Sequence, residues 1–304
     1  MEGDNLMKKE LDELSAIRKF TGDDSLEFIG PDDTFGFKCQ QCGKCCMNRT
    51  DIIINPFDVY NGAKYLGIAP IEFVTKYCFP DLGGNSKIPM VLLATSENGF
   101  CPLLKFDVKD GGKFKCMIHP VKPGACANHP IGVTYALNKE TGESTMRYIK
   151  VQQCSNSTSD EQHVVKDWVK PYIDNQSEID MAHKIQHLAT DYFNPRKFWF
   201  LLTSLCDSFK EDDRFEKELV VKAFNKYMSS TIAIGYVNYD INRPFIEQAE
   251  ENIKELGKFY AETKDVYDDL TTLFEEFSGK DFDEYFDEFE KSMKKGEVEN
   301  DNNN

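Results

Sequence analysis

Hydrophobic residues are spaced in two different ways along this chain of 304 residues. In the first half they form short runs separated by glycine, proline, asparagine and aspartate, a pattern typical of short strands and turns. In the second half they recur every three or four positions, which indicates helices that bury one face. We predict strands at residues 51–54, 90–94, 100–106, 114–118, 131–137 and 145–151, the last two forming a hairpin that turns at 138–142.

Two helix-start signals interrupt the strand pattern of the first half. Residues 55–58 (Asn-Pro-Phe-Asp) offer an N-cap asparagine, a proline at the first helical position and an acidic residue in the first turn. We predict a helix from there to residue 66, ended by Gly67, because glycine readily adopts the left-handed conformation that closes a helix. Residues 70–72 open a second short helix, which is expected to end near 78–80.

From about residue 160 onwards nearly every segment has helical periodicity. The predicted helices cover residues 161–173, 177–192, 195–209, 215–236 and 244–277. The last of these carries apolar residues at alternating steps of four and three, which suits packing against other helices. Residues 281–290 interleave aromatic and acidic side chains, and we predict an amphipathic helix that closes the bundle.

The change in pattern near residue 155 predicts how the chain is divided. The parts are an N-terminal helical extension (1–34, with its helix at 6–20), a cysteine-cluster metal-binding domain (35–155), a helical bundle domain (160–293) and a disordered tail (294–304). The expected fold class is α+β, a small cysteine-rich metal-binding α+β domain followed by an all-helical domain.

The composition describes an acidic protein that can form a core. Apolar residues make up 40% of the chain, and with 23 Phe and 13 Tyr much of that core should be aromatic. A net charge of -16 argues against a nucleic-acid partner, which needs a basic patch, and against adhesion to an anionic membrane. No apolar run approaches the roughly 20 residues that span a bilayer, and residues 1–20 lack the core of a signal peptide. We therefore expect a cytoplasmic protein.

The cysteines are the residues that indicate a possible chemical function. Four of the ten cysteines lie within residues 39–46, and in a reducing cytoplasm we expect metal ligation rather than disulfides. Neighbouring side chains of an extended chain point in opposite directions, so Cys45 and Cys46 could serve two sites, or act as one ligand and its neighbour. Eight cysteines are candidate ligands and could complete two four-ligand sites: Cys39, Cys42, Cys45, Cys46, Cys101, Cys116, Cys126 and Cys154.

The spacing of these cysteines leaves the metal open. Cys-x2-Cys places two thiolates on one tight turn, which suits tetrahedral zinc or an iron–sulfur cluster. Cys39, Cys42 and Cys45 with a distant Cys101-Pro102 partly match the bacterial ferredoxin arrangement, but a second such run is absent. The predicted cofactor is therefore zinc or an iron–sulfur cluster.

All five histidines are candidates for further ligands, and His163, His183 and His187 suggest a helical metal site. His119 and His129 each follow a cysteine by three residues and are spare candidates for the metal. His183 and His187 share one helix face, but the His-Glu-x-x-His pattern is missing, so a solvated or capping role is expected.

No other catalytic machinery is predicted. Cys78 and Cys206 are expected to be core residues, since neither has Lys, Arg or His in an arrangement that calls for a catalytic thiol. The chain has no Gly-x-Ser-x-Gly turn, and its paired glycines at 83–84 and 111–112 are typical of turns, not of a cofactor-binding loop.

Four stretches of the chain carry a family resemblance: CQQCGKCC from Cys39, DIII from Asp51, CPLL from Cys101, and CMIHPVKPGACANHP from Cys116. In the order and spacing of seven cysteines, residues 36–155 resemble the YkgJ-type cysteine-cluster family. Members are described as zinc- or iron-chelating proteins and sometimes as iron–sulfur oxidoreductases. The resemblance implies a metal-binding protein with a redox or electron-transfer role and a redox partner.

This chain departs from the family pattern at two positions. Lys122 stands where the family usually has arginine, and His129 stands where it usually has an aromatic residue. The second departure leaves open whether His129 has become a ligand.

A related cysteine pattern occurs in flagellin lysine methylases. This more distant resemblance implies an alternative, a protein lysine N-methyltransferase-like enzyme that acts on a protein substrate with the cluster assisting. A third hypothesis is an interaction module that the metal only stabilises, with the helical half binding the partner. Whether the chain is an enzyme stays open at this point.

Overall fold

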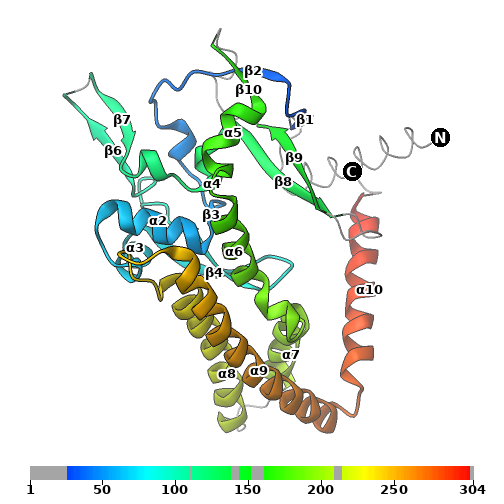
Figure 1. The fold of residues 1–304 in the computed structure, drawn as a ribbon. Coiled ribbons are helices and arrows are strands. Elements are labelled where there is room, and N and C mark those ends of the chain that lie inside the picture. The colour runs from blue at the N-terminus through cyan, green and yellow to red at the C-terminus, as the bar shows by residue number, and fades with distance from the viewer. Residues whose placement is uncertain (1–25, 110, 138–143, 152–160, 209–213, 302–304) are drawn as a thin grey trace.

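The computed structural model describes residues 26–109, 111–137, 144–151, 161–208 and 214–301. The strands and short helices of the first half gather in the upper part of Figure 1, and long helices form the lower part. We call residues 26–164 the cysteine-rich part and residues 165–301 the helical part. This arrangement confirms the predicted α+β fold class. The helix predicted at residues 6–20 lies outside the described residues.

Small antiparallel sheets build the cysteine-rich part. One has the order β3 (Ile53–Ile54), β5 (Pro89–Leu93), β4 (Cys78–Leu82), and a hairpin joins β6 (Leu104–Asp107) to β7 (Lys113–Cys116). Another has the order β1 (Glu27–Ile29), β9 (Ser144–Lys150), β8 (Ile131–Leu137), and a last pair joins β2 (Thr34–Gly36) to β10 (Gln162–Val164). The start of the described chain is therefore paired to strands more than a hundred residues further along.

Helix α2 (Pro56–Leu66) follows its sequence signal closely. The Asn55 side chain accepts a hydrogen bond from the Asp58 backbone N–H (2.8 Å), and the Asp58 carboxylate accepts one from the Asn55 N–H (3.1 Å). These reciprocal bonds are a capping box. Gly67 ends the helix with φ 66°. The predicted boundaries are confirmed, and α3 (Pro70–Tyr77) follows as the second predicted helix.

Strand β4, which comes directly after α3, is not predicted by the hydrophobic pattern. Pro80 lies in its middle, and proline lacks the N–H that a central strand needs. β4 is at the edge of its sheet, where Pro80 faces Val91 of β5, and an edge strand tolerates proline. The strand brings Cys78 opposite Leu93.

The helical part contains the predicted helices, with ends that shift by a few residues. They are α5 (Val165–Ile173), α6 (Gln176–His187), α7 (Pro195–Ser208), α8 (Arg214–Ile232), α9 (Phe245–Ser278) and α10 (Phe282–Asp301). The helix prediction is wrong at residues 162–164, which form β10. These residues pair with β2, and a ring nitrogen of His163 bonds the carbonyl oxygen of Phe37 at 2.7 Å. A tertiary pairing has here overridden local helix propensity.

Aromatic rings fill the core of the helical part. Phe198 meets Phe193 with ring centroids 5.4 Å apart and Tyr227 at 5.5 Å, both edge to face. Aromatic pairs favour this geometry because ring edges and ring faces carry opposite partial charge. On the outside, Phe289 of α10 stacks on Phe200 of α7 with centroids 4.5 Å apart. The closing helix predicted from residues 281–290 thus packs against the bundle.

The cysteine-rich and helical parts share side chains across their boundary. Phe57 and Tyr60 of α2 are buried in the aromatic core of the helical part. In return Tyr236, in the π-helical turn η4 (Ala233–Val237), is 1% exposed within the core of the cysteine-rich part. Its hydroxyl accepts a hydrogen bond from Gln186 Nε2 (3.0 Å). The division into separate domains stays a prediction.

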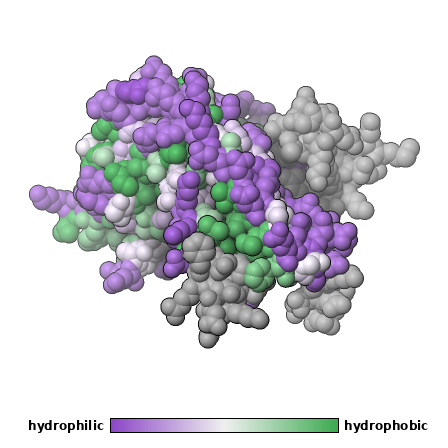
Figure 2. Space-filling view, turned by 90° about the horizontal axis from the view of Figure 1, so that it is seen from below, coloured by the Kyte–Doolittle hydropathy of each residue, from purple (hydrophilic) through white to green (hydrophobic). Residues whose placement is uncertain are grey.

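Seen from the helical end, the surface is largely hydrophilic, with hydrophobic residues visible between the polar ones (Figure 2). Large exposed apolar side chains of the helices include Leu219 and Val221 of α8 and Val266 of α9. Across the described ranges, no helix has both the length and the apolar content that crossing a bilayer requires.

Replacing Tyr236 with alanine is expected to destabilise both parts together. Loss of a large buried aromatic side chain should lower the free energy of unfolding by about 3–5 kcal/mol, and Tyr236→Phe, which only leaves Gln186 without its partner, by about 1 kcal/mol. Denaturant unfolding followed by circular dichroism and by Trp fluorescence measures both. The exposed Tyr65→Ala is the matched control. If the two probes showed separate unfolding transitions and Tyr236→Ala shifted the midpoint of only one, the shared core would be contradicted.

Candidate metal centre

Five cysteines from separate segments lie around one place in the fold. Cys45 and Cys46 are on the 3-10 turn η1 (Lys44–Cys46), Cys101 precedes β6, Cys116 ends β7, and Cys126 is in α4 (Gly124–Ala127). The thiols act on one another electrostatically: the pKa of Cys46 is influenced by Cys45, Cys126 and Cys101, and that of Cys101 by Cys116 and Cys45. The fold thus brings together five of the eight predicted ligands.

Backbone contacts hold the loop of residues 39–46 against the β6–β7 hairpin. The N–H of Cys101 donates to the carbonyl oxygen of Cys46 (2.8 Å), and the N–H of Phe114 donates to that of Gln41 (2.9 Å). Gly43 has φ +75°, and a Cβ there would lie 3.1 Å from the Phe114 ring. Glycine is therefore suited to this position for two reasons, the left-handed backbone conformation and the close approach of the hairpin.

Cys45 and Cys46 form a coupled pair. Their Sγ atoms are 3.8 Å apart and share a hydrogen bond. This hydrogen bond lowers the pKa of Cys45 to about 6. Burial raises that pKa, and the positive charges of Lys122 and Arg49 lower it further. The same bond, together with burial, raises the pKa of Cys46. One thiol of the pair is therefore ready to ionise near neutral pH, and the other acts as its hydrogen-bond donor.

Backbone N–H groups point at two further thiols. The Sγ of Cys101 accepts a hydrogen bond from the N–H of Leu103, and the Sγ of Cys116 accepts one from that of Ile118. Burial raises the pKa of both thiols, and these bonds oppose the rise because N–H donors favour the thiolate.

Two positive side chains face the thiols. Burial raises the pKa of Cys126 to about 12, and the nearby ammonium of Lys122 opposes this. The guanidinium of Arg49 acts on Cys45 and is itself held by Asp51, with Nε and Nη2 at 2.6 and 2.8 Å from the two carboxylate oxygens. Positive charge here offsets the negative charge that several thiolates would bring.

A cavity of about 500 Å³ lies beside the thiols. Its wall includes Cys39, Cys45, Cys126, Asp58, His119 and His129. A second cavity, of about 370 Å³, shares Asn128, His129 and Tyr172 with the first.

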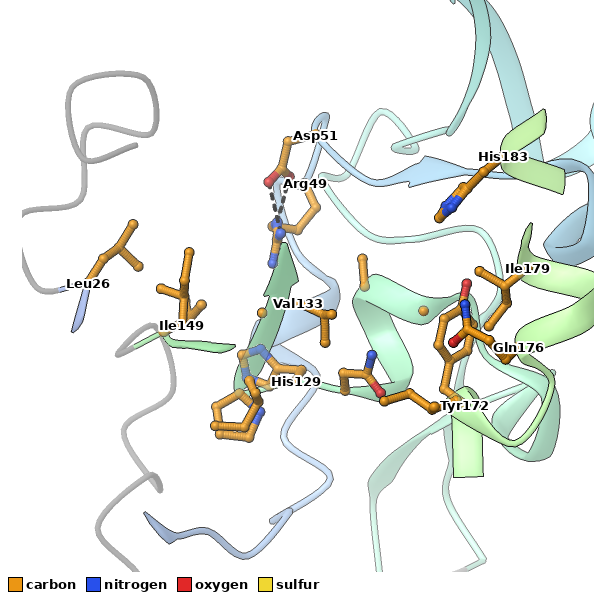
Figure 3. A pocket seen from close by; sticks show the side chains of 18 residues that line it. Leu26, Arg49, Asp51, His129, Val133, Ile149, Tyr172, Gln176, Ile179 and His183 are labelled. Carbon is orange, nitrogen blue, oxygen red and sulfur yellow. Dashed lines mark hydrogen bonds and ion pairs between the residues drawn. The ribbon is translucent and has the colours of Figure 1, made fainter. Parts of the chain in front are cut away.

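Figure 3 shows the second cavity from close by. Leu26 and Ile149 lie on one side of it, and Tyr172, Gln176 and Ile179 lie on the other. His183 of α6 also lines this cavity, where burial lowers its pKa and the neighbouring His187 adds to the effect. His183 is half-buried at the wall of this cavity, and the solvated or capping role expected from the sequence stays a prediction.

Asp58 connects α2 to the short helix that carries Cys126. Besides capping α2, its carboxylate accepts a hydrogen bond from the N–H of Gly124, the first residue of α4. Burial raises the pKa of this carboxyl to about 7, although both hydrogen bonds favour the ionised form. A Cβ at Gly124 would lie 2.5 Å from the Tyr172 ring, so glycine lets this tyrosine close over the start of α4.

The remaining predicted ligands are not among the five thiols that the fold brings together. Cys39 and Cys42 are exposed in the loop before η1, and Cys154 lies outside the described residues. His119 is exposed in the 3-10 turn η2 (His119–Val121), whereas the ring of His129 is half-buried.

Cys78 lies in the core, as the sequence predicts, and close to the candidate ligands, which the sequence does not predict. It packs on the same hydrophobic cluster as Cys101, Cys116 and Cys126, and burial together with the charge of Cys101 raises its pKa. Only the pairing of β4 with β5 brings it there, and nothing in its local sequence indicates this. Cys206, in α7, packs instead on the helical core.

The donor set suits a thiophilic metal, although the donors do not close around a point. Within the described ranges no three His, Cys, Asp or Glu side chains converge as a metal site needs, and none of the described cysteines is in a disulfide. The chemistry of the donors nevertheless fits zinc or iron, since thiolates and imidazole are the ligands that these metals prefer. A buried imidazole nitrogen, Nε2 of His129, also lacks a hydrogen-bond partner among the described residues.

A comparison with protein families identifies the class of the cysteine-rich part. Residues 38–164 match the CxxCxxCC family, which is described as a putative zinc- or iron-chelating domain. The match of this segment is consistent with the YkgJ-type resemblance. The match ends where β10 ends and does not extend into the helical part. No match was found among curated proteins or among solved structures.

The Asp58→Ala variant should lose stability in a pH-dependent way. Folding raises the pKa of this carboxyl from an ordinary value near 3.9 to about 7. The stability that the protonated carboxyl contributes to the folded state is therefore complete below the pKa of the unfolded chain, and it is lost as the pH rises through the pKa of the folded chain. The difference in unfolding free energy between wild type and variant should therefore shrink between pH 5 and pH 8, by at most about 1.4 kcal/mol per pH unit. Denaturant titrations at both pH values measure this difference.

Asn55→Ala is the control for this test, because it removes the other half of the same capping box without removing a titrating group. Its effect on stability should be equal at the two pH values. A constant or growing effect of Asp58→Ala with rising pH would contradict the raised pKa.

Proposed function

We propose that the cysteine-rich part binds zinc or iron through Cys45, Cys46, Cys101, Cys116 and Cys126. Cys39, Cys42 and Cys154 are the further ligands that the sequence predicts. The observation that carries the proposal is that thiols from four separate segments influence one another electrostatically, and that Cys45 and Cys126 of this set line one cavity. The family description, a zinc- or iron-chelating domain, supports the same chemistry.

The ionisation of the thiols supports the proposal independently. A metal binds thiolates, so its binding displaces protons from thiols. The low pKa of Cys45, caused first by the bond from Cys46, makes this thiol the natural first ligand. The remaining thiols have pKa values raised by burial, and a bound cation would supply the charge that keeps them ionised.

Binding of a metal should couple to folding. The sheets around the thiols are small, with strands of two to seven residues, and small sheets need a further source of stability. If the metal is zinc, its binding free energy becomes folding free energy and its role is structural. If it is an iron–sulfur cluster, electron transfer with a protein redox partner is the role to test.

Metal content decides between zinc and an iron–sulfur cluster. The full chain, purified without oxygen, should contain zinc and be colourless, or contain iron with an equal amount of acid-labile sulfide and be brown. Elemental analysis, sulfide determination and a visible spectrum measure this. A chain with neither metal and with its cysteines paired in disulfides would refute the proposal.

Replacing Cys126 with serine should weaken metal binding by more than about 100-fold, because even groups behind the ligands contribute 10–100-fold to affinity. Competition with a chromophoric chelator measures the affinity. Cys206→Ser, a thiol of the helical core, is the matched control and should leave it unchanged. Equal affinity in both variants would exclude Cys126 from the ligand set.

A further inference from the structure

We propose that His129 supplies a nitrogen ligand to this metal site, so that the site holds a mixed set of thiolates and one imidazole. The inference rests on the proposed function. It assigns a role to a residue that the cysteine spacing does not define and at which this chain departs from the YkgJ-type pattern.

The first argument is an unpaired polar atom. Nε2 of His129 is buried and has no hydrogen-bond partner in the part of the chain that the structure describes. A buried polar atom without a partner costs free energy, so such atoms are rare and usually mark a site for an ion, a water or a ligand. An imidazole nitrogen with a free electron pair is a common metal ligand.

The second argument is location. His129 follows Cys126 by three residues, directly after α4, and lines the same cavity as Cys45 and Cys126. The backbone here is held firmly, since the indole N–H of Trp168 donates to the carbonyl oxygen of Asn128 (3.0 Å). Phe37 packs edge-on to the imidazole, with ring centroids 5.9 Å apart. The imidazole is therefore kept among the donors instead of turning to solvent.

The third argument concerns charge. Metals bind the neutral imidazole, which brings no charge of its own into the site. A neutral nitrogen in place of a thiolate also leaves the loaded site less negative, which reduces repulsion among the remaining thiolates.

His119 offers a matched comparison within the same chain. It also follows a cysteine, Cys116, by three residues, but it is exposed. Sequence spacing alone treats the two histidines as equal. Burial and the unpaired nitrogen distinguish His129.

The test uses the full chain as wild type, His129→Phe, His129→Cys and His119→Phe, each loaded with zinc and with cobalt. His129→Phe, which restores an aromatic residue at this position, should bind zinc at least tenfold more weakly and change the d–d bands of the cobalt form. His129→Cys should recover the affinity and increase the thiolate-to-cobalt charge-transfer absorption. His119→Phe should match wild type in both measurements.

A measurement on the wild type avoids dependence on how the variants fold. In the protein loaded with cadmium-113 and labelled with nitrogen-15, one ring nitrogen should show scalar coupling to the metal, and its signal should be present in His119→Phe and absent in His129→Phe. No coupled histidine nitrogen, or unchanged zinc affinity and cobalt spectrum in His129→Phe, would overturn this inference while leaving the proposed metal site in place. A wild-type chain that takes up none of these metals would overturn both.

Discussion

Gathering several thiols in one place is the constraint on which the rest of this structure depends. Burial disfavours the thiolate, and each thiolate raises the pKa of its neighbours, as the raised values of Cys46 and Cys126 illustrate. The chain counters this with N–H groups aimed at sulfur, with the hydrogen bond between Cys45 and Cys46, and with the charge of Lys122. Such an arrangement makes physical sense for groups that are to carry negative charge together.

The same constraint explains how the surrounding fold is built. Each thiol is carried by a short element, and each element is fixed by residues from elsewhere, as when Asp58 of α2 and Tyr172 of α5 hold the start of α4. The small sheets bury little on their own, so they share side chains with the helical part through Phe57 and Tyr236. The two parts are thus packed together through side chains that each buries in the core of the other.

Prediction from sequence succeeded where the structure depends on local interactions. The capping box of α2 forms between residues three apart, and the helices of the second half follow from periodicity within each segment. It failed where a distant partner decided the outcome. Residues 162–164 pair with β2 instead of extending a helix, and Pro80 fits a strand only because that strand is at a sheet edge.

The candidate site, too, was predictable where it depends on local sequence and not where it depends on distant contacts. By itself, the sequence determined that this is an α+β protein with a cysteine cluster of metal-binding type, because the spacing of thiols in residues 39–46 and the pattern of segments are local properties. Only the tertiary structure decided which thiols meet: Cys78 comes close to Cys101 through strand pairing, while Cys39 and Cys42 stay exposed. It also distinguished the half-buried His129 from the exposed His119. Burial depends on what packs against a ring and not on its distance from a cysteine along the chain.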